Sequence, residues 1–208
     1  MGGNFSFYDW LMNPLEKKVL HKVRRTLMAR PRGVVLEIGA GTGANLPFYR
    51  YQYIDQLDIL DLSIEKKIRD FDYPDHVSVR LLEGQAESLP FPDHAYDYVV
   101  ISLVLCSVID LPKSLSEVLR VLKPGGRFIF IEHILPEENA LRGLFQKLTP
   151  LWKRMAHNCH LNRETLDAIE AAGFDQLELF PVYKDIFVGG VAQRPYEMTR
   201  IHKRQLRR

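Results

Sequence analysis

The stretch that decides the fold is Val34-Val35-Leu36-Glu37-Ile38-Gly39-Ala40-Gly41-Thr42-Gly43-Ala44-Asn45. Its first half is an apolar run that contains one acid, which predicts a buried parallel strand. Three glycines then alternate with small residues, and glycine lets the backbone turn sharply and lets a ligand lie directly against the main chain. A helical pattern begins at Asn45, and the free amides of that helix would face the ligand. The stretch therefore predicts a strand, a ligand-binding turn and a helix.

Two cofactors fit such a turn, and a structural loop without a ligand is a third possibility. Gly39, Gly41 and Ala44 satisfy the loose dinucleotide pattern G-x-G-x-x-G/A, which favours NAD only weakly. The other cofactor is S-adenosyl-L-methionine (SAM), which carries an ammonium and a sulfonium group but no pyrophosphate. Glu37 stands before the first glycine, where a carboxylate would attract the cations of SAM and repel a pyrophosphate. The acid therefore favours SAM.

Two motifs carry a family resemblance. Leu36 to Gly43 reads Leu-Glu-Ile-Gly-Ala-Gly-Thr-Gly and resembles motif I of the class I SAM-dependent methyltransferases (methyltransferase type 11-like) at every position. Leu122-Lys123-Pro124-Gly125-Gly126, between an amphipathic helix and a strand, resembles a second motif of that family, and NAD-binding chains have no reason to carry it. The resemblance implies a SAM-dependent methyltransferase whose product is S-adenosyl-L-homocysteine. It implies these cofactor contacts in the loop: Glu37, Gly39, Ala40, Gly41 and Gly43.

The resemblance also implies the fold and the division of the chain. We expect an α/β protein with a seven-stranded, doubly wound (Rossmann-like) sheet in the order 3-2-1-4-5-7-6, whose last-inserted strand is antiparallel. The expected parts are an N-terminal helical cap at 1–32, a SAM-binding core at 33–193 with a helical insert at about 137–158, and a basic tail at 194–208. Within the cap, the segment around Tyr8 resembles the opening of the quinone-biosynthesis methyltransferases, where it covers the cofactor. Tyr8 is therefore a candidate cofactor contact, with plain packing as the alternative.

The composition limits the partners. The chain has 208 residues, with 46% hydrophobic and 26% charged residues, which suits one soluble α/β domain. A net charge of +2 gives no reason to expect a nucleic-acid partner. Two cysteines cannot form a disulfide framework, so we expect a cytoplasmic location. Without a long apolar run or a secretory signal we expect no stable membrane anchor, although peripheral contact stays open, and we expect no metal site.

An acid after the second strand is what the cofactor's ribose needs, because a carboxylate accepts from both sugar hydroxyls. Asp61 ends the apolar run that starts at Tyr53, and it lies 22 positions after Gly39. Asp58 is the competitor, but it falls inside the run. We therefore expect Asp61 to bind the ribose and Leu62 to pack under the adenine.

The ends of the next two strands complete the expected cofactor site. Gly84-Gln85-Ala86 resembles the family segment whose acid accepts from the adenine amino group, so Gln85 and Ala86 are expected contacts. The amide of Gln85 lacks the charge of that acid, which would weaken the contact. The strand at 95–102 should end beside the first strand, at the switch point where open parallel sheets bind ligands. This places Ser102 and Leu103 at the floor of the site.

The sequence indicates less clearly which residues would contact the methyl acceptor. His133 follows the fifth strand and could take a proton from the methyl acceptor, because its usual pKa of about 6.5 suits neutral pH. Cys106 invites interpretation as a nucleophile, but methyl transfer from SAM needs none, so packing is expected. A helix over 139–155 is either a core helix with a basic rim or a lid over an apolar acceptor pocket. Its apolar face comprises Leu141, Leu144, Phe145, Leu148, Leu151, Trp152 and Met155.

A closer resemblance appears in the second half of the chain. Residues 103–108, Glu132-His133, Trp152 and the run Cys159-x-Leu161-x-Arg163-Glu164 resemble the microsomal alkyl-thiol methyltransferases. The similarity covers most of residues 33–180 and implies a small hydrophobic acceptor, either a thiol, a quinone or a lipid-like molecule. A SAM-binding regulatory or scaffold protein without catalysis would carry the same cofactor motifs and is the alternative. A nucleic-acid methyltransferase is not supported, because no Asn/Asp-Pro-Pro-Tyr/Phe motif follows the fourth strand.

Overall fold

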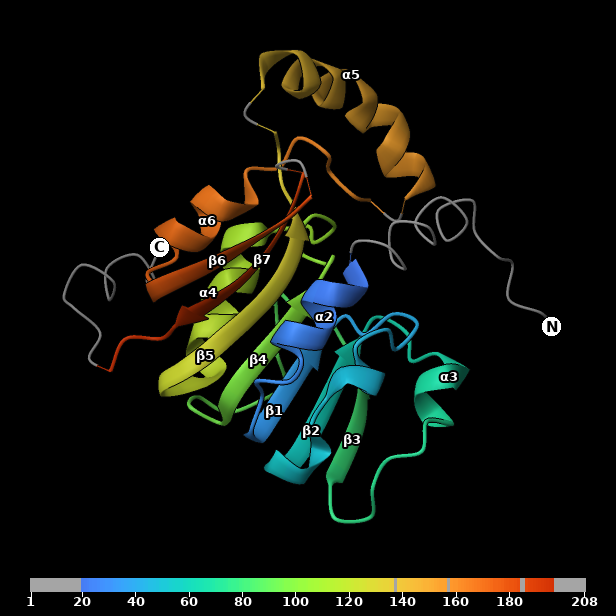
Figure 1. Cartoon of the computed structure of the whole chain (residues 1–208), viewed down its shortest axis with the longest axis vertical. Helices are drawn as coiled ribbons and strands as arrows, with labels where there is room; N and C mark the ends of the chain where they lie inside the picture. The colour runs from blue at the N-terminus through green and yellow to red at the C-terminus, as the bar shows by residue number, and fades with distance from the viewer. Residues whose placement is uncertain (1–19, 137, 157, 184–185, 197–208) are drawn as a thin grey trace.

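The computed structural model describes residues 20–136, 138–156, 158–183 and 186–196 (Figure 1). The expected cofactor contact Tyr8, most of the expected N-terminal cap and residues 197–208 of the expected tail lie outside these ranges. Among the helices of the described ranges, none combines the length and the hydropathy that a membrane span requires.

A seven-stranded sheet runs through the molecule in the order β3-β2-β1-β4-β5-β7-β6. The strands are β1 (Gly33–Ile38), β2 (Ile54–Asp61), β3 (Ser78–Glu83), β4 (Tyr96–Ser102), β5 (Leu122–His133), β6 (Asp175–Tyr183) and β7 (Phe187–Gln193). β1 to β5 pair in parallel, and β7 lies antiparallel between β5 and β6. The predicted α/β fold, strand order and antiparallel last strand are confirmed.

Helices cover both faces of the sheet (Figure 1). α2 (His21–Leu27) lies on one face, and α4 (Leu111–Val121) and α6 (Thr165–Ala171) lie on the other. Successive residues of a strand point to opposite faces, so Val35 of β1 joins the core under α2 while Leu36 joins the core under α4. The near-continuous apolar runs of the central strands follow from this burial on both faces.

One long helix stands apart from these layers. α5 (Asn139–Met155) lies beyond the carboxyl end of β5, while the short α3 (Lys66–Arg69) follows β2 (Figure 1). The carboxyl edge of a parallel sheet is where ligands bind in doubly wound folds. α5 therefore lies over the edge at which the predicted site residues gather.

Two local expectations are wrong. The helix predicted from Asn45 is replaced by two short 3-10 turns, at Leu46–Phe48 and Tyr51–Tyr53. The backbone of Tyr49 is extended (φ −66°, ψ 140°), and its hydroxyl donates to Glu37, so a tertiary contact overrides the helical pattern. The Pro-Gly-Gly segment was expected to precede the fifth strand, but it lies within β5, where Gly125 has a φ of +75° at an irregularity of the β4–β5 pairing.

Candidate active site at the carboxyl edge of the sheet

The glycine loop leaves β1 at the centre of this edge. Gly39, Gly41 and Gly43 have φ values of +73°, +53° and +76°, a region that strains residues with a Cβ. A Cβ on Gly39 would overlap the side chain of Val104, so this glycine is also required by packing. A Cβ on Gly41 would meet nothing within 4 Å. The loop is therefore closed on the Gly39 side and open at Gly41, while Ala40 between them is buried.

Glu37 lies beneath the loop inside a polar network. It is 1% exposed, and its two carboxylate oxygens accept from Asn45 Nδ2 and from the Tyr49 hydroxyl, each at 2.8 Å. Asn45 in turn accepts from the guanidinium of Arg24 on α2. Burial raises the pKa of Glu37 above its usual 4.5, and the hydrogen bonds from Asn45 and Tyr49 offset part of that rise. The network fixes the acid at the base of the loop.

Asp61 meets the loop from the end of β2. Its Oδ2 accepts from the backbone amide of Gly41 at 2.8 Å, and its Oδ1 accepts from the amide of Ser63 at 3.3 Å. The next residue, Leu62, is 74% exposed, which is unusual for leucine and leaves an apolar surface beside the loop. The structure therefore brings Asp61 to the glycine turn.

Asp58, the other candidate acid of β2, is engaged inside the sheet. It is fully buried and forms an ion pair with Arg80. It also accepts from the Tyr96 hydroxyl at 2.5 Å and from Gln56 Nε2 at 2.9 Å. The Asp58 carboxylate is thus already hydrogen-bonded and ion-paired to side chains within the fold.

The ends of β3 and β4 lie against the same loop. The amide of Gly84 donates to the Asp61 carbonyl at 2.8 Å, and the two residues that follow are the exposed Gln85 and the buried Ala86. Asn45 Nδ2 also donates to Ser102 Oγ at 3.1 Å, which ties the end of β4 to the base of the loop. The residues predicted from four strand ends are therefore gathered along one edge.

The chain changes direction sharply after β4. Leu103 has a φ of +57°, a conformation rare for a residue with a branched side chain and often found at functional sites. The next two amides, of Val104 and Leu105, donate to Glu132 Oε1 at 2.9 and 3.0 Å. Burial raises the pKa of Glu132 to about 7, although these backbone hydrogen bonds oppose the rise. The turn carries residues 103–108 away from the sheet and opens a space beside β5.

A cavity of about 150 Å³ occupies this space between the sheet and α5. It is lined by Leu103, Cys106, His133, Phe145, Trp152, Cys159, Leu161, Ile186 and Phe187. Most of these side chains are apolar. Leu103 belongs both to this wall and to the end of β4, so the cavity adjoins the expected cofactor site.

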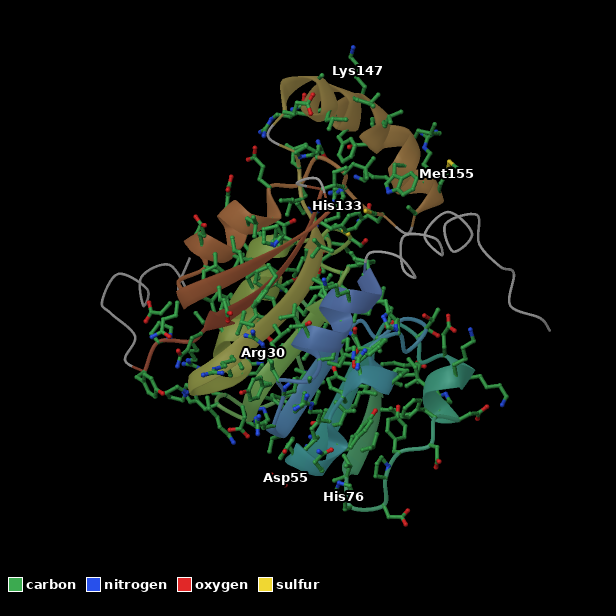
Figure 2. The ribbon with its side chains drawn as sticks, in the orientation of Figure 1. Arg30, Asp55, His76, His133, Lys147 and Met155 are labelled. Atoms are coloured by element: carbon green, nitrogen blue, oxygen red, sulfur yellow. The ribbon has the colours of Figure 1, made fainter. Side chains whose placement is uncertain are left out.

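His133 closes the sheet side of the cavity, between the end of β5 and α5 (Figure 2). It is 5% exposed, and its ring stacks on Phe145 with centroids 6.2 Å apart. In the described part of the chain, neither ring nitrogen makes a hydrogen bond of good geometry, although the backbone of Leu161 interacts with the ring. Burial lowers the pKa of His133 to about 4, so the imidazole is neutral at pH 7.

Only part of the apolar face of α5 contributes to the cavity. Phe145 and Trp152 line it, whereas Leu144 and Leu148 are 48% and 43% exposed. The helix lies beyond the edge of the sheet rather than on one of its faces (Figure 1). The segment was expected to be either a core helix or a lid over an apolar pocket. α5 is not a core helix, and only the strip with Phe145 and Trp152 borders the cavity.

Two groups of residues in this region are not predicted from the sequence. Asn45 and Tyr49 were assigned to a helix, yet their side chains hold Glu37. Cys159 was not paired with Cys106, although their Sγ atoms lie 3.4 Å apart. A buried carboxylate needs hydrogen-bond donors nearby, so the expected burial of Glu37 could have pointed to Asn45 and Tyr49. The two cysteines are 53 positions apart, and no sequence pattern links them.

Comparisons with known proteins agree with this geometry. A family model described as a methyltransferase domain matches residues 36–130. Thiol S-methyltransferase TMT1B of Rattus norvegicus is 36% identical over 151 residues, which is 70% of this chain. The alignment covers 61% of that relative, so the chain spans about three fifths of its length.

A second relative is covered more fully. The ubiquinone/menaquinone biosynthesis C-methyltransferase UbiE of Proteus mirabilis is 32% identical over 203 residues, which is 83% of this chain and 80% of that protein. Among solved structures, a putative methyltransferase from Bacillus halodurans superposes with a TM-score of 0.67 at 19% identity, over 85% of this chain and 98% of the other. That structure bears on the fold alone. On the sequence similarity, together with the glycine loop and the seven-stranded sheet, the chain belongs to the class I SAM-dependent methyltransferases.

Proposed function

We propose that this protein transfers the methyl group of SAM to the sulfur of a small hydrophobic thiol and releases S-adenosyl-L-homocysteine. The observation that carries the proposal is the apolar cavity beside β5, which shares Leu103 with the end of β4 at the cofactor edge. An acceptor in the cavity would lie next to a cofactor bound along that edge. The similarity to a thiol S-methyltransferase supports sulfur as the acceptor atom.

Each predicted cofactor residue has a proposed role at this edge. The backbone of Gly39, Ala40, Gly41 and Gly43 supports the methionine part of SAM, above the carboxylate of Glu37. Asp61 accepts from the ribose hydroxyls with the lone pairs that Gly41 and Ser63 leave free. Leu62 packs on the adenine, Gln85 and Ala86 border the adenine edge, and Ser102 and Leu103 form the floor. The exposure of Leu62 and the open space at Gly41 support this placement.

The chemistry is direct displacement at the sulfonium methyl group. Alignment of the acceptor with the breaking bond is the main contribution and can lower the barrier by roughly 7–11 kcal/mol. A thiol with a pKa near about 8.5 is already partly ionised at neutral pH, so a strong general base is not required. His133 is the proposed proton acceptor for the remaining thiol, and its lowered pKa makes it a weak base. We therefore expect its help to matter only where the acceptor is protonated.

A quinone acceptor is the second candidate, and the similarity to UbiE favours it. Size argues against it. A cavity of about 150 Å³ is comparable with an engineered apolar cavity that holds benzene. A small alkyl or aryl thiol fits within this space, whereas the long side chain of a quinone would have to extend out of it.

An acceptor panel tests the proposal. The full chain is incubated with SAM and with alkyl thiols, aryl thiols or reduced quinones, and S-adenosyl-L-homocysteine and the methylated acceptor are quantified by mass spectrometry. We expect turnover with thiols, with kcat/KM rising with apolar size until the cavity is full. Turnover with quinols and none with any thiol would replace the thiol by the second candidate. Cofactor binding without any turnover would favour the regulatory alternative.

We also propose that the protein acts in the cytoplasm on a small molecule, without a nucleic-acid partner. The small net charge and the two free cysteines support this placement. Localisation of the tagged full chain by microscopy tests it, and a membrane-bound or secreted pool would contradict it.

A further inference from the structure

Three side chains in the wall of the cavity bring metal-binding atoms together. The Sγ atoms of Cys106 and Cys159 lie 3.4 Å apart, and these two atoms and a ring nitrogen of His133 all lie within 4.8 Å of one another. The three residues are 3%, 5% and 7% exposed for Cys106, His133 and Cys159. They come from three separate segments: the loop after β4, the end of β5 and the loop between α5 and α6. Such convergence of two thiols and an imidazole differs from ordinary packing of single cysteines.

The two ring nitrogens of His133 can each make a polar contact that the described residues provide only weakly. Neither ring nitrogen makes a hydrogen bond of good geometry among the described residues, although the ring is almost completely buried. The backbone of Leu161 and of His133 itself lies close enough only to oppose the lowering of the His133 pKa. A buried polar group without a partner typically costs about 1–3 kcal/mol. A metal ion bound through one ring nitrogen would remove that cost.

The loop that carries Cys159 is fixed against the loop that carries Cys106. The amide of His160 donates to the Cys106 carbonyl at 2.9 Å, and Asn158 Nδ2 donates to the Ser107 carbonyl at 2.9 Å. The guanidinium of Arg163 donates to the carbonyls of Leu105 and Val108 at 2.6 and 2.8 Å. The two thiols therefore face each other because the backbone holds them there.

The donor set selects the metal. Two thiolates and one imidazole are the ligands that Zn²⁺ prefers, and oxygen-seeking cations such as Mg²⁺ and Ca²⁺ would not choose them. Zinc–ligand distances of about 2.0–2.3 Å place tetrahedral ligand atoms roughly 3.5–3.8 Å apart. The present spacing of 3.4 to 4.8 Å needs shifts of only about 1 Å. Zinc sites with three protein ligands keep a fourth position for water or substrate.

We propose that Cys106, His133 and Cys159 bind a Zn²⁺ ion whose fourth coordination position faces the cavity and takes the sulfur of the methyl acceptor. The metal site stands on the geometry alone, whereas the acceptor at its fourth position rests on the proposed thiol methylation. As the acceptor's sulfur–zinc bond forms, the thiol releases its proton to water. The bound thiolate then forms a bond to the methyl carbon as the bond from that carbon to the sulfonium breaks. The products are a neutral thioether, which is a weaker zinc ligand and leaves, and S-adenosyl-L-homocysteine.

Metal binding is measured first on the full chain, purified under reducing conditions without chelator. We expect one equivalent of zinc by elemental mass spectrometry, and a Co²⁺ complex with tetrahedral ligand-field bands and a thiolate-to-cobalt charge-transfer band. Cys106→Ser, Cys159→Ser and His133→Gln should each hold about a tenth of the metal or less. His76→Gln is the control, because His76 is exposed and lies at the opposite end of the sheet (Figure 2). Absence of stoichiometric zinc and of the charge-transfer band in the wild-type protein would overturn the site.

The oxidation state of Cys106 and Cys159 in the wild-type protein tests the metal site independently of the variants. A Cys106–Cys159 disulfide that persists in the reduced, zinc-supplemented protein would overturn the site, because a disulfide cannot provide two thiolates. Two zinc-protected thiols, which resist alkylation until a chelator is added, would support it.

The acceptor half is tested by addition of a small alkyl thiol to the Co²⁺ protein. A shift of the charge-transfer band supports direct sulfur ligation, and an unchanged spectrum with bound cobalt overturns it. Thiol methylation that proceeds unchanged in zinc-free protein would overturn the inference and leave the proposed function intact. Zinc binding with no methylation of any thiol would overturn the proposed function and leave the metal site intact.

Discussion

Two acids lie at the glycine loop with different hydrogen-bond partners, and the difference supports separate proposed roles. Glu37 lies below the loop, where Asn45 and Tyr49 donate to its two oxygens. Asp61 lies beside the loop and accepts from the amide of Gly41. In the proposed function the first acid is a fixed negative charge under the cofactor, and the second accepts from the ribose. Variants of the two acids should therefore have separable effects.

Asp61→Ala should weaken SAM binding by about 1.5–3 kcal/mol, the usual contribution of hydrogen bonds to a charged group. This corresponds to a roughly 10- to 150-fold higher Kd. Isothermal titration calorimetry with SAM measures it. Asp55→Ala is the matched control, because Asp55 lies on the same strand at the opposite end of the sheet (Figure 2). A larger loss of affinity in Asp58→Ala than in Asp61→Ala would mean that the wrong acid has been assigned to the ribose.

Glu37→Gln should change how the free energy of unfolding depends on pH and should also weaken SAM binding. Burial raises the pKa of Glu37 above 4.5, so above pH 4.5 the folded protein holds a proton that the unfolded chain has lost. The free energy of unfolding then falls as pH rises from 4.5 towards the raised folded pKa. Glutamine cannot ionise, and its amide can still bond Asn45 and Tyr49, so the variant should lack this decline and bind SAM more weakly. Denaturant unfolding at several pH values measures the slope, and equal slopes in both proteins would contradict the account.

His133→Ala should lower turnover most at pH values below the thiol's pKa and little where the thiol is already ionised. His133 acts as proton acceptor only without zinc and as ligand only with zinc, where the thiol proton goes to water. Either role promotes ionisation of the acceptor, so the pH profile tests what the two alternatives share. The zinc content then distinguishes them. SAM affinity should barely change, because His133 lines the acceptor cavity. A uniform loss of rate at all pH values would indicate a purely structural residue.

At the scale of elements, α5 and the loop after it form the outer wall of the cavity. α5 contributes Phe145 and Trp152, and the following loop contributes Cys159 and Leu161. The other wall is the edge of the sheet. If the acceptor binds in this cavity as proposed, its size depends on how α5 lies beyond β5, while the proposed cofactor binding depends on the strand ends.

Phe145→Ala should raise the KM for a hydrophobic thiol about tenfold, because loss of an apolar contact of this size costs about 1–3 kcal/mol in binding. Leu148→Ala is the control on the same helix, since Leu148 is 43% exposed and does not line the cavity. SAM affinity should stay unchanged in both variants. Steady-state kinetics with a varied thiol measures KM. Equal effects of the two substitutions would place the acceptor outside the cavity.

Features that local sequence patterns encode were predictable, whereas features that depend on tertiary contacts were not. β1 and β2 were predictable because apolar runs end at turn signals. The position of Asp61 beside the glycine loop was predictable because its spacing from Gly39 follows the fold, while its role as ribose ligand stays a prediction. The helix at Asn45 was wrong, since Tyr49 extends to reach Glu37, a contact that no local pattern encodes. The Cys106–Cys159 pair was not predictable for the same reason, because hydrogen bonds between two distant loops bring the thiols together.

On the scale of the whole molecule, the doubly wound sheet gathers the proposed cofactor residues and the cavity along one edge. The glycine loop, Asp61 and the end of β4 lie towards the centre, and the cavity lies beside β5. Parallel strands have their carboxyl ends on the same side, so residues far apart in sequence meet there without long loops. Methyl transfer requires little beyond alignment of two bound molecules, and we propose that this arrangement provides it.

Methyl transfer from SAM labelled with deuterium in its methyl group tests the central claim most directly. The full chain is incubated with the labelled cofactor and a small alkyl thiol, and both products are followed by mass spectrometry. The account predicts that the thioether gains the intact trideuterated methyl group and that S-adenosyl-L-homocysteine appears in equal amount. Asp61→Ala should slow the transfer at low SAM, whereas Asp55→Ala should not. A thioether without the label, or no methylated product from any acceptor while the labelled cofactor stays bound and intact, would contradict the account.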